Sequence, residues 1–98
     1  MAIMEINIIP LGTETPSVSR YIAQAVKILK EKGVNYELTS MGTIVEGKLD
    51  DLFEIAKKMH LATFTQGIKR VVTTIKIDDR RDKSSDMKEK IQRVKEEL

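Results

Sequence analysis

Residues 36–47 read YELTSMGTIVEG, and this stretch decides how the chain folds. Apolar and polar residues alternate over 34–39, which predicts a half-buried β-strand. The β-branched residues of 43–45 predict a second strand, which ends at Gly47. Only residues 40–42 separate the two strands, whereas a parallel connection needs a crossover of about a dozen residues or more. The two strands are therefore predicted to form an antiparallel hairpin.

A helical pattern of apolar residues precedes the hairpin, and another follows it. The first, over 16–32, is predicted to begin with Thr15 as its N-cap and Pro16 at its first helical position. The second, over 49–66, is predicted to end at Gly67, because glycine readily adopts the left-handed conformation that ends many helices. Both patterns are amphipathic, so each helix is expected to bury one face.

Two further strands enclose these elements. Residues 3–11 alternate in polarity up to Pro10, which cannot donate a ladder hydrogen bond. Residues 70–78 are rich in β-branched side chains. The resulting order, β-α-β-β-α-β, is that of the ferredoxin-like sandwich, an α+β fold. Because crossovers are right-handed, both helices should cover one face of a four-stranded antiparallel sheet and leave the other face open.

A charged helix is predicted at the end of the chain, within 83–98. Its apolar residues recur at helical spacing and form a narrow seam of Met87, Ile91, Val94 and Leu98. A seam this narrow cannot form a core by itself, so the helix is expected to dock on a sheet edge or on a neighbouring subunit. The whole chain, residues 1–98, is then predicted to be a single domain.

Composition excludes several classes of site and partner. The chain has 98 residues with no Cys and one His, which excludes a disulfide framework, a thiolate metal site and a poly-His zinc site within one chain. The net charge of +2 is too small to indicate nucleic acid, and the first and last strands lack aromatic residues for base stacking. The apolar runs are too short to span a bilayer, and no signal-peptide pattern is visible. We therefore expect a cytoplasmic protein that binds neither nucleic acid nor membrane.

Three charged or polar features could suggest chemistry, and for each we favour a structural interpretation. The turn at 78–82, DDRRD, resembles a metal or phosphate cluster, but such mixed charges usually pair with one another in solvent. His60 has no acid or nucleophile partner at a recognisable spacing, so a packing or capping role is expected. Lys76 is expected to pair across the sheet with Glu5 or Glu37. No catalytic residue and no metal ligand are predicted.

Three segments of the chain point to a known family. They are IIPLGTETPSVS at 8–19, YELTSMGTIVEG at 36–47 and KRVVTTIKIDDRRD at 69–82. Together they resemble the small thiamine-binding protein family, over essentially the whole chain and in the same element order. The resemblance implies a ferredoxin-like subunit that pairs its sheets in a homotetramer, as a dimer of dimers. It also implies binding of thiamine or a thiamine-like pyrimidine without catalysis, and no cofactor besides this ligand.

The same resemblance implies a ligand site at strand ends and loops. Its candidate positions are Pro10, Leu11, Gly12, Thr13, Ser40, Met41, Gly42, Thr43 and Glu46. The chemistry of thiamine adds further candidates, because a cationic thiazolium ring attracts a carboxylate and an aminopyrimidine needs hydrogen-bond donors and acceptors. The carboxylate could come from Glu37 or Glu46. Hydroxyl groups are available from Thr13, Ser19, Ser40 and Thr43.

Two other functions remain open from the residues alone. The open sheet face could serve only for oligomerisation, in which case the chain would be a structural or regulatory protein-interaction module. A hydrolase that uses His60 or the acidic turn is the least favoured function, because the sequence shows no nucleophile and base at a recognisable spacing.

Overall fold

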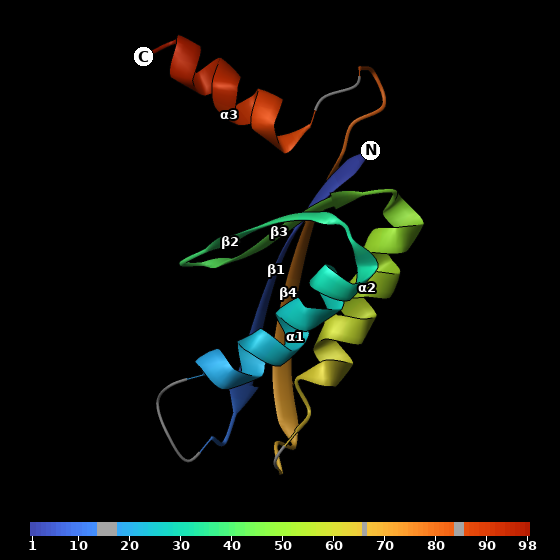
Figure 1. The fold of residues 1–98 in the computed structure, drawn as a ribbon, viewed down its shortest axis with the longest axis vertical. Helices are drawn as coiled ribbons and strands as arrows, with labels where there is room; N and C mark the ends of the chain where they lie inside the picture. The colour runs from blue at the N-terminus through green and yellow to red at the C-terminus, as the bar shows by residue number, and fades with distance from the viewer. Residues whose placement is uncertain (14–17, 66, 84–85) are drawn as a thin grey trace.

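The computed structural model describes residues 1–13, 18–65, 67–83 and 86–98 and contains a layer of strands, a layer of helices and one further helix (Figure 1). In chain order the elements are β1 Ala2–Leu11, α1 Ser19–Lys32, β2 Asn35–Thr39, β3 Gly42–Gly47, α2 Leu49–Ala62, β4 Arg70–Asp79 and α3 Met87–Glu96. This order confirms the predicted α+β, ferredoxin-like arrangement with an added C-terminal helix. The predicted start of the first helix, at residues 15–16, lies outside the described residues. None of the described helices is long and apolar enough to cross a membrane.

The four strands form one antiparallel sheet in the order β2-β3-β1-β4. β1 pairs with β3 from Ala2 to Ile6 and with β4 along its full length, from Ala2 to Leu11. Alternate residues of β1 point toward α1 and α2 and are buried, as the period of two predicts; they include Ala2, Met4, Ile6 and Ile8. They join buried residues of both helices in one core cluster, so the two helices cover one face and leave the other open.

The end of α2 differs from the prediction. The helix ends at Ala62 and not at residue 66, so the predicted stop at Gly67 is wrong. Thr63 follows the last helical residue, and its fully buried hydroxyl donates to the carbonyl oxygen of Met59 at 2.9 Å. Gly67 has a positive φ of 81°, but it lies in the connection to β4. A threonine that bonds back to the preceding turn competes with further helix, and the spacing of apolar residues does not reveal this.

The first turn of α3 is held on the open side of the sheet. The backbone N–H of Met87 donates to Oε2 of Glu46 at 2.9 Å, and Nδ2 of Asn35 donates to Oε1 of the same carboxylate at 3.0 Å. Glu46 is only 6% exposed, so the protein itself supplies the donors that its buried carboxylate requires. Asp86 begins the helix in a capping box with Glu89. The start of α3 is therefore fixed by side chains from β2 and β3.

Beyond this turn, α3 points away from the rest of the molecule (Figure 1). Met87 is buried, and Lys90 forms an ion pair with Asp78 of β4. The later residues of the apolar seam are exposed: Ile91, Val94 and Leu98. Among the residues that the structure describes, the seam is thus covered only at its first residue, and docking of the remainder on a neighbouring subunit stays a prediction.

We predict that Glu46→Ala releases α3 while the sheet stays folded. The substitution removes the acceptor of the Met87 N–H, and leaving such a buried donor unpaired costs about 1–3 kcal/mol. It also removes the acceptor of the Asn35 amide, which is exposed and can bind water instead. Amide hydrogen exchange should accelerate along α3 and change little in β1 and β4. Glu37→Ala is the matched control, since Glu37 lies on the neighbouring strand and makes no hydrogen bond to α3 in the described structure. Unchanged exchange in α3 of the Glu46→Ala variant would contradict this anchoring role.

Candidate functional site

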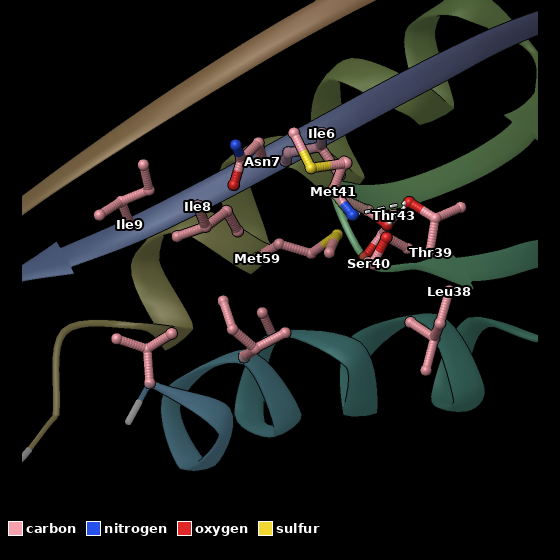
Figure 2. A pocket seen from close by; sticks show the side chains of 14 residues that line it. Ile6, Asn7, Ile8, Ile9, Leu38, Thr39, Ser40, Met41, Thr43 and Met59 are labelled. Carbon is pink, nitrogen blue, oxygen red and sulfur yellow. Dashed lines mark hydrogen bonds between the residues drawn. The ribbon is translucent and has the colours of Figure 1, made fainter. Parts of the chain in front are cut away.

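A cavity lies between the tip of the β2–β3 hairpin, the second half of β1 and the first turns of α1 (Figure 2). We call it the hairpin pocket. It is lined by residues 6–9 of β1, residues 38–43 of the hairpin, apolar residues at the start of α1, and Met59 of α2. Its volume is about 350 Å³. This volume falls in the range of about 300–1,000 Å³ that small-molecule sites occupy.

The hairpin pocket exists because β3 is shorter than β1. The pairing of β1 with β3 ends where Ile6 faces Thr43, and β1 then continues beside β4 alone. At the hairpin tip, a Cβ on Gly42 would lie 3.0 Å from the carbonyl oxygen of Ile6, so glycine permits this close approach. The hydroxyl of Thr39 donates to the Gly42 carbonyl at 2.8 Å and accepts from the N–H of Met41 at 3.2 Å. These bonds fix the turn that forms one wall of the cavity.

Thr43 provides the polar group that most needs an explanation. It is 5% exposed, lines the hairpin pocket, and its hydroxyl makes no hydrogen bond within the part of the chain that the structure describes. Buried hydroxyls are normally paired, so this one is available to a molecule in the cavity. Asn7 and Ser40 add an amide and a second hydroxyl at exposed positions of the lining. Figure 2 shows these polar groups among apolar side chains.

The hairpin pocket carries no charge on its described lining. Apart from the polar groups already named, apolar side chains such as Ile8, Leu38 and Met59 form its walls. An organic cation would find no carboxylate there, and burying an unpaired charge is costly. An uncharged ring with a hydrogen-bonding edge suits such a cavity.

The predicted site residues divide into separate groups in the structure. Four of them meet in the hairpin pocket: Ser40, Met41, Gly42 and Thr43. Four others lie at the far end of β1 or directly after it and do not line this pocket: Pro10, Leu11, Gly12 and Thr13. Ser19 lines a different groove, between α1 and β2. Only the hairpin part of the predicted set therefore surrounds a common cavity.

The two predicted carboxylates lie on the other side of the sheet. Glu37 borders a cavity of about 260 Å³ beneath α3, which we call the face pocket, together with Glu5 and Lys76. The register places Lys76 directly opposite Glu5 across β1 and β4, so Glu5 is the nearer of its two predicted partners. Glu46 lines neither pocket; its carboxylate is buried and engaged in holding α3.

The prediction from sequence missed several residues of the hairpin pocket, among them Asn7, Leu38 and Thr39. Asn7 gave no separate signal, because its polarity fits the alternation of strand 3–11. Leu38 and Thr39 lie on a predicted strand, and only the way the hairpin closes on β1 brings them to a cavity. Their contribution depends on tertiary packing, which local patterns do not contain.

The charged turn after β4 pairs largely with itself, as predicted. Arg80 donates two hydrogen bonds to Asp82, at 2.5 and 2.9 Å, and Arg81 binds Asp79 at 3.0 Å. The hydrogen bond from Arg80 lowers the pKa of the Asp82 carboxyl to about 2. Across the described ranges, no group of three or more acidic, His or Cys side chains is placed to hold a metal ion.

His60 packs between α2 and β4, in line with its predicted structural role. Its Nδ1 atom lies 2.6 Å from the hydroxyl oxygen of Thr73 on β4. Its ring meets the ring of Phe64 edge-on, with 5.3 Å between the centroids. The hydrogen bond holds the imidazole against the sheet. The ring contact packs it against Phe64, which follows α2.

Comparison with known proteins gives one consistent family. The family model described as "Thiamine-binding protein" matches residues 4–95. The protein YqgV of Bacillus subtilis is 49% identical over 102 aligned positions, covering 100% of this chain and 98% of YqgV. A protein of Methanothermobacter thermautotrophicus is 46% identical, with 100% of each chain covered. A crystal structure from Methanocaldococcus jannaschii has a TM-score of 0.88 and 35% identity, covering 97% of this chain and 96% of that one. With nearly its whole length matched, this chain belongs to the thiamine-binding protein family.

Proposed function

We propose that this protein binds thiamine or a thiamine-like pyrimidine, without catalysis, as a homo-oligomer. We further propose that the pyrimidine ring occupies the hairpin pocket. The observation that carries this proposal is the buried hydroxyl of Thr43, which has no protein partner in the described structure and borders a cavity of about 350 Å³. Membership of the thiamine-binding protein family supports the choice of ligand.

The chemistry of the hairpin pocket suits an aminopyrimidine. Such a ring has flat apolar faces and an edge that carries both an amino donor and a nitrogen acceptor. The apolar walls, including Ile8 and Met59, would cover the faces, and a methionine sulfur makes favourable contacts with aromatic rings. The hydroxyl of Thr43, which faces the helices beside Ile6, can donate or accept a hydrogen bond to the edge of the ring without any charge. The amide of Asn7 lies on the opposite face of β1, at an exposed part of the lining.

The thiazolium ring requires a different environment. A cation is best stabilised near a carboxylate, and the described lining of the hairpin pocket has none. Of the predicted carboxylates, Glu46 already accepts two hydrogen bonds in the protein, and Glu37 lies on the other side of the sheet beneath α3, so neither faces the hairpin pocket. We therefore propose that the thiazolium half of thiamine extends out of the hairpin pocket, where solvent and exposed acidic groups can accommodate its charge.

Exposed apolar surface supports the homo-oligomer. The seam of α3 leaves Ile91 and Val94 exposed, and the open face of the sheet leaves Ile9 and Val72 exposed. Apolar surface of this kind gains free energy when a second surface covers it. A homotetramer that pairs its sheets, with α3 docked on a neighbouring subunit, would cover both regions.

The same surfaces favour the alternative function, a structural or regulatory protein-interaction module. In that case the open face and the seam would only mediate assembly, and the hairpin pocket would stay empty. The choice between the two functions depends on ligand binding and not on assembly.

We predict that Thr43→Val lowers thiamine affinity without destabilising the fold. Loss of one hydrogen bond to the ligand corresponds to about 1–1.5 kcal/mol, or roughly a 5- to 12-fold rise in Kd. Thr63→Val is the matched control, since it removes a buried hydroxyl that is bonded to the backbone of Met59. That control should lose about 1 kcal/mol of unfolding free energy and keep its affinity. Isothermal titration and urea unfolding give both quantities, and an unchanged Kd in Thr43→Val would contradict the proposed site.

We also predict that the two halves of thiamine behave differently when tested separately. The free aminopyrimidine should raise the thermal midpoint, because a ligand that binds only the folded state stabilises it by mass action, by about 2.7 kcal/mol at 100 times its Kd. The free thiazolium half should cause no shift at the same concentration. If saturating thiamine and pyrimidine both leave the midpoint of an intact oligomer unchanged, the protein-interaction function is the correct one.

A further inference from the structure

A second cavity continues the hairpin pocket along α1. It lies between α1 and β2 and has a volume of about 570 Å³; we call it the α1–β2 groove. Both cavities are lined by Val18, Ile22 and Leu38. Leu38 reaches from β2 toward α1 and is 62% exposed, so it borders both cavities without sealing one from the other (Figure 2). A molecule held in the hairpin pocket can therefore extend into the α1–β2 groove.

The α1–β2 groove runs along α1 away from the hairpin tip. β2 follows α1 after the turn at Gly33 and returns toward the tip, so Tyr36 lies farther from the hairpin pocket than Leu38. Accordingly, Tyr36 and Lys30 line the groove and not the hairpin pocket. Lys30 follows Ile22 by eight residues, which corresponds to about 12 Å along a helix. The groove thus leads from the hairpin pocket to the last turn of α1.

The charges on the described lining of the groove are all positive. They belong to Lys27 and Lys30, which lie one turn apart on the same face of α1, and the described lining has no carboxylate. Within the part of the chain that the structure describes, neither lysine forms an ion pair. Tyr36 adds a phenol hydroxyl that makes no hydrogen bond to a described residue. Two ammonium groups and a phenol donor without an acidic partner favour an anion.

The groove is apolar between the hairpin pocket and these lysines. Ile22 and the buried Val26 of α1 form one wall, and Leu38 of β2 forms the other. Burying an unpaired charge in such a surface is costly, and two lysines repel a further cation. The thiazolium ring of free thiamine therefore stays in solvent, as proposed above. A phosphate group reverses this balance, because a phosphate monoester carries about −1.5 to −2 charges at pH 7.

We infer that the preferred ligand is a phosphate ester of thiamine, with its pyrimidine ring in the hairpin pocket and its phosphate between Lys27 and Lys30 in the α1–β2 groove. The ester brings its own negative charge to the thiazolium ring, for which neither cavity offers a carboxylate on its described lining. The two ammonium groups form charge-assisted hydrogen bonds with the phosphate oxygens, and such bonds are about twice as strong as neutral ones. This assignment rests on the proposed function and adds the chemical form of the ligand.

Isothermal titration of thiamine and of thiamine monophosphate into the same protein tests this assignment. We expect the Kd of the monophosphate to be roughly tenfold lower, which corresponds to about 1.4 kcal/mol. Because both lysines are exposed, the difference should shrink when salt is raised from about 0.01 M to about 1 M, over which the Debye length falls from about 30 Å to about 3 Å.

The double variant Lys27→Gln/Lys30→Gln should lose this preference. Its Kd for the monophosphate should rise roughly tenfold, to that of thiamine, because the charge-assisted bonds are lost, whereas its Kd for thiamine should not rise. Lys88→Gln/Lys95→Gln is the matched control, since it removes the same charge from exposed positions of α3 and should keep the preference.

The possible results separate this assignment from the proposed function. If thiamine and its monophosphate bind with the same Kd, or if the Lys27→Gln/Lys30→Gln variant keeps the preference, the phosphate site is wrong and thiamine binding stands. An equal loss of preference in both double variants would indicate a general effect of net charge and would also overturn the site. If neither ligand binds to the folded protein, the proposed function fails, and the phosphate site fails with it.

Discussion

The pairing of β3 with β1, which stops where Thr43 faces Ile6, is the constraint on which the rest of the structure depends. On one face of the sheet it brings Val45 into the core beside Met4. Beyond Ile6 it leaves β1 paired with β4 on one side only, and the hairpin tip closes over the unpaired side to form a cavity. Near its other end, where Ile3 faces Glu46, the same pairing presents the carboxylate of Glu46 to the start of α3. Core, pocket and terminal helix thus all depend on the length of one strand pair.

Much of the fold could be predicted from the sequence because its signals are local. The alternation over 3–11 and 34–39 identifies strands, and a connection of three residues permits only a hairpin. The end of α2 could not be predicted in this way, because the apolar spacing continues past Ala62, where the hydroxyl of Thr63 bonds back to Met59. The anchoring of α3 is also hidden, since Glu46 and Met87 lie 41 residues apart in sequence. No spacing rule connects a carboxylate on a strand with the first turn of a helix so distant along the chain.

The candidate site shows the same division between residues that local sequence signals predict and residues that only tertiary packing brings together. Residues 40–43 are contiguous, so placing one of them in a pocket places the others near it, and the structure brings them together. Residues 10–13 lie at the far end of β1 or directly after it, beyond the pocket. The sequence could not show this, because strand periodicity indicates which face a residue occupies and not how far the neighbouring strand extends. The identity of the family comes from motifs spread over the chain. The arrangement of Asn7, Thr43 and Met59 around one cavity comes only from packing.

The anchoring of α3 through its first turn has a mechanical consequence. A helix of ten residues is about 15 Å long, so a tilt of about 10° at its first turn displaces its far end by roughly 2–3 Å. The core takes no part in such a movement, since Met87 is the only seam residue of the described α3 that is buried. Glu46 therefore lies at the point about which the exposed part of α3 would tilt. Small substitutions around Glu46 would change the direction of α3, and with it the spacing between subunits of the proposed homo-oligomer, while the rest of the domain keeps its shape.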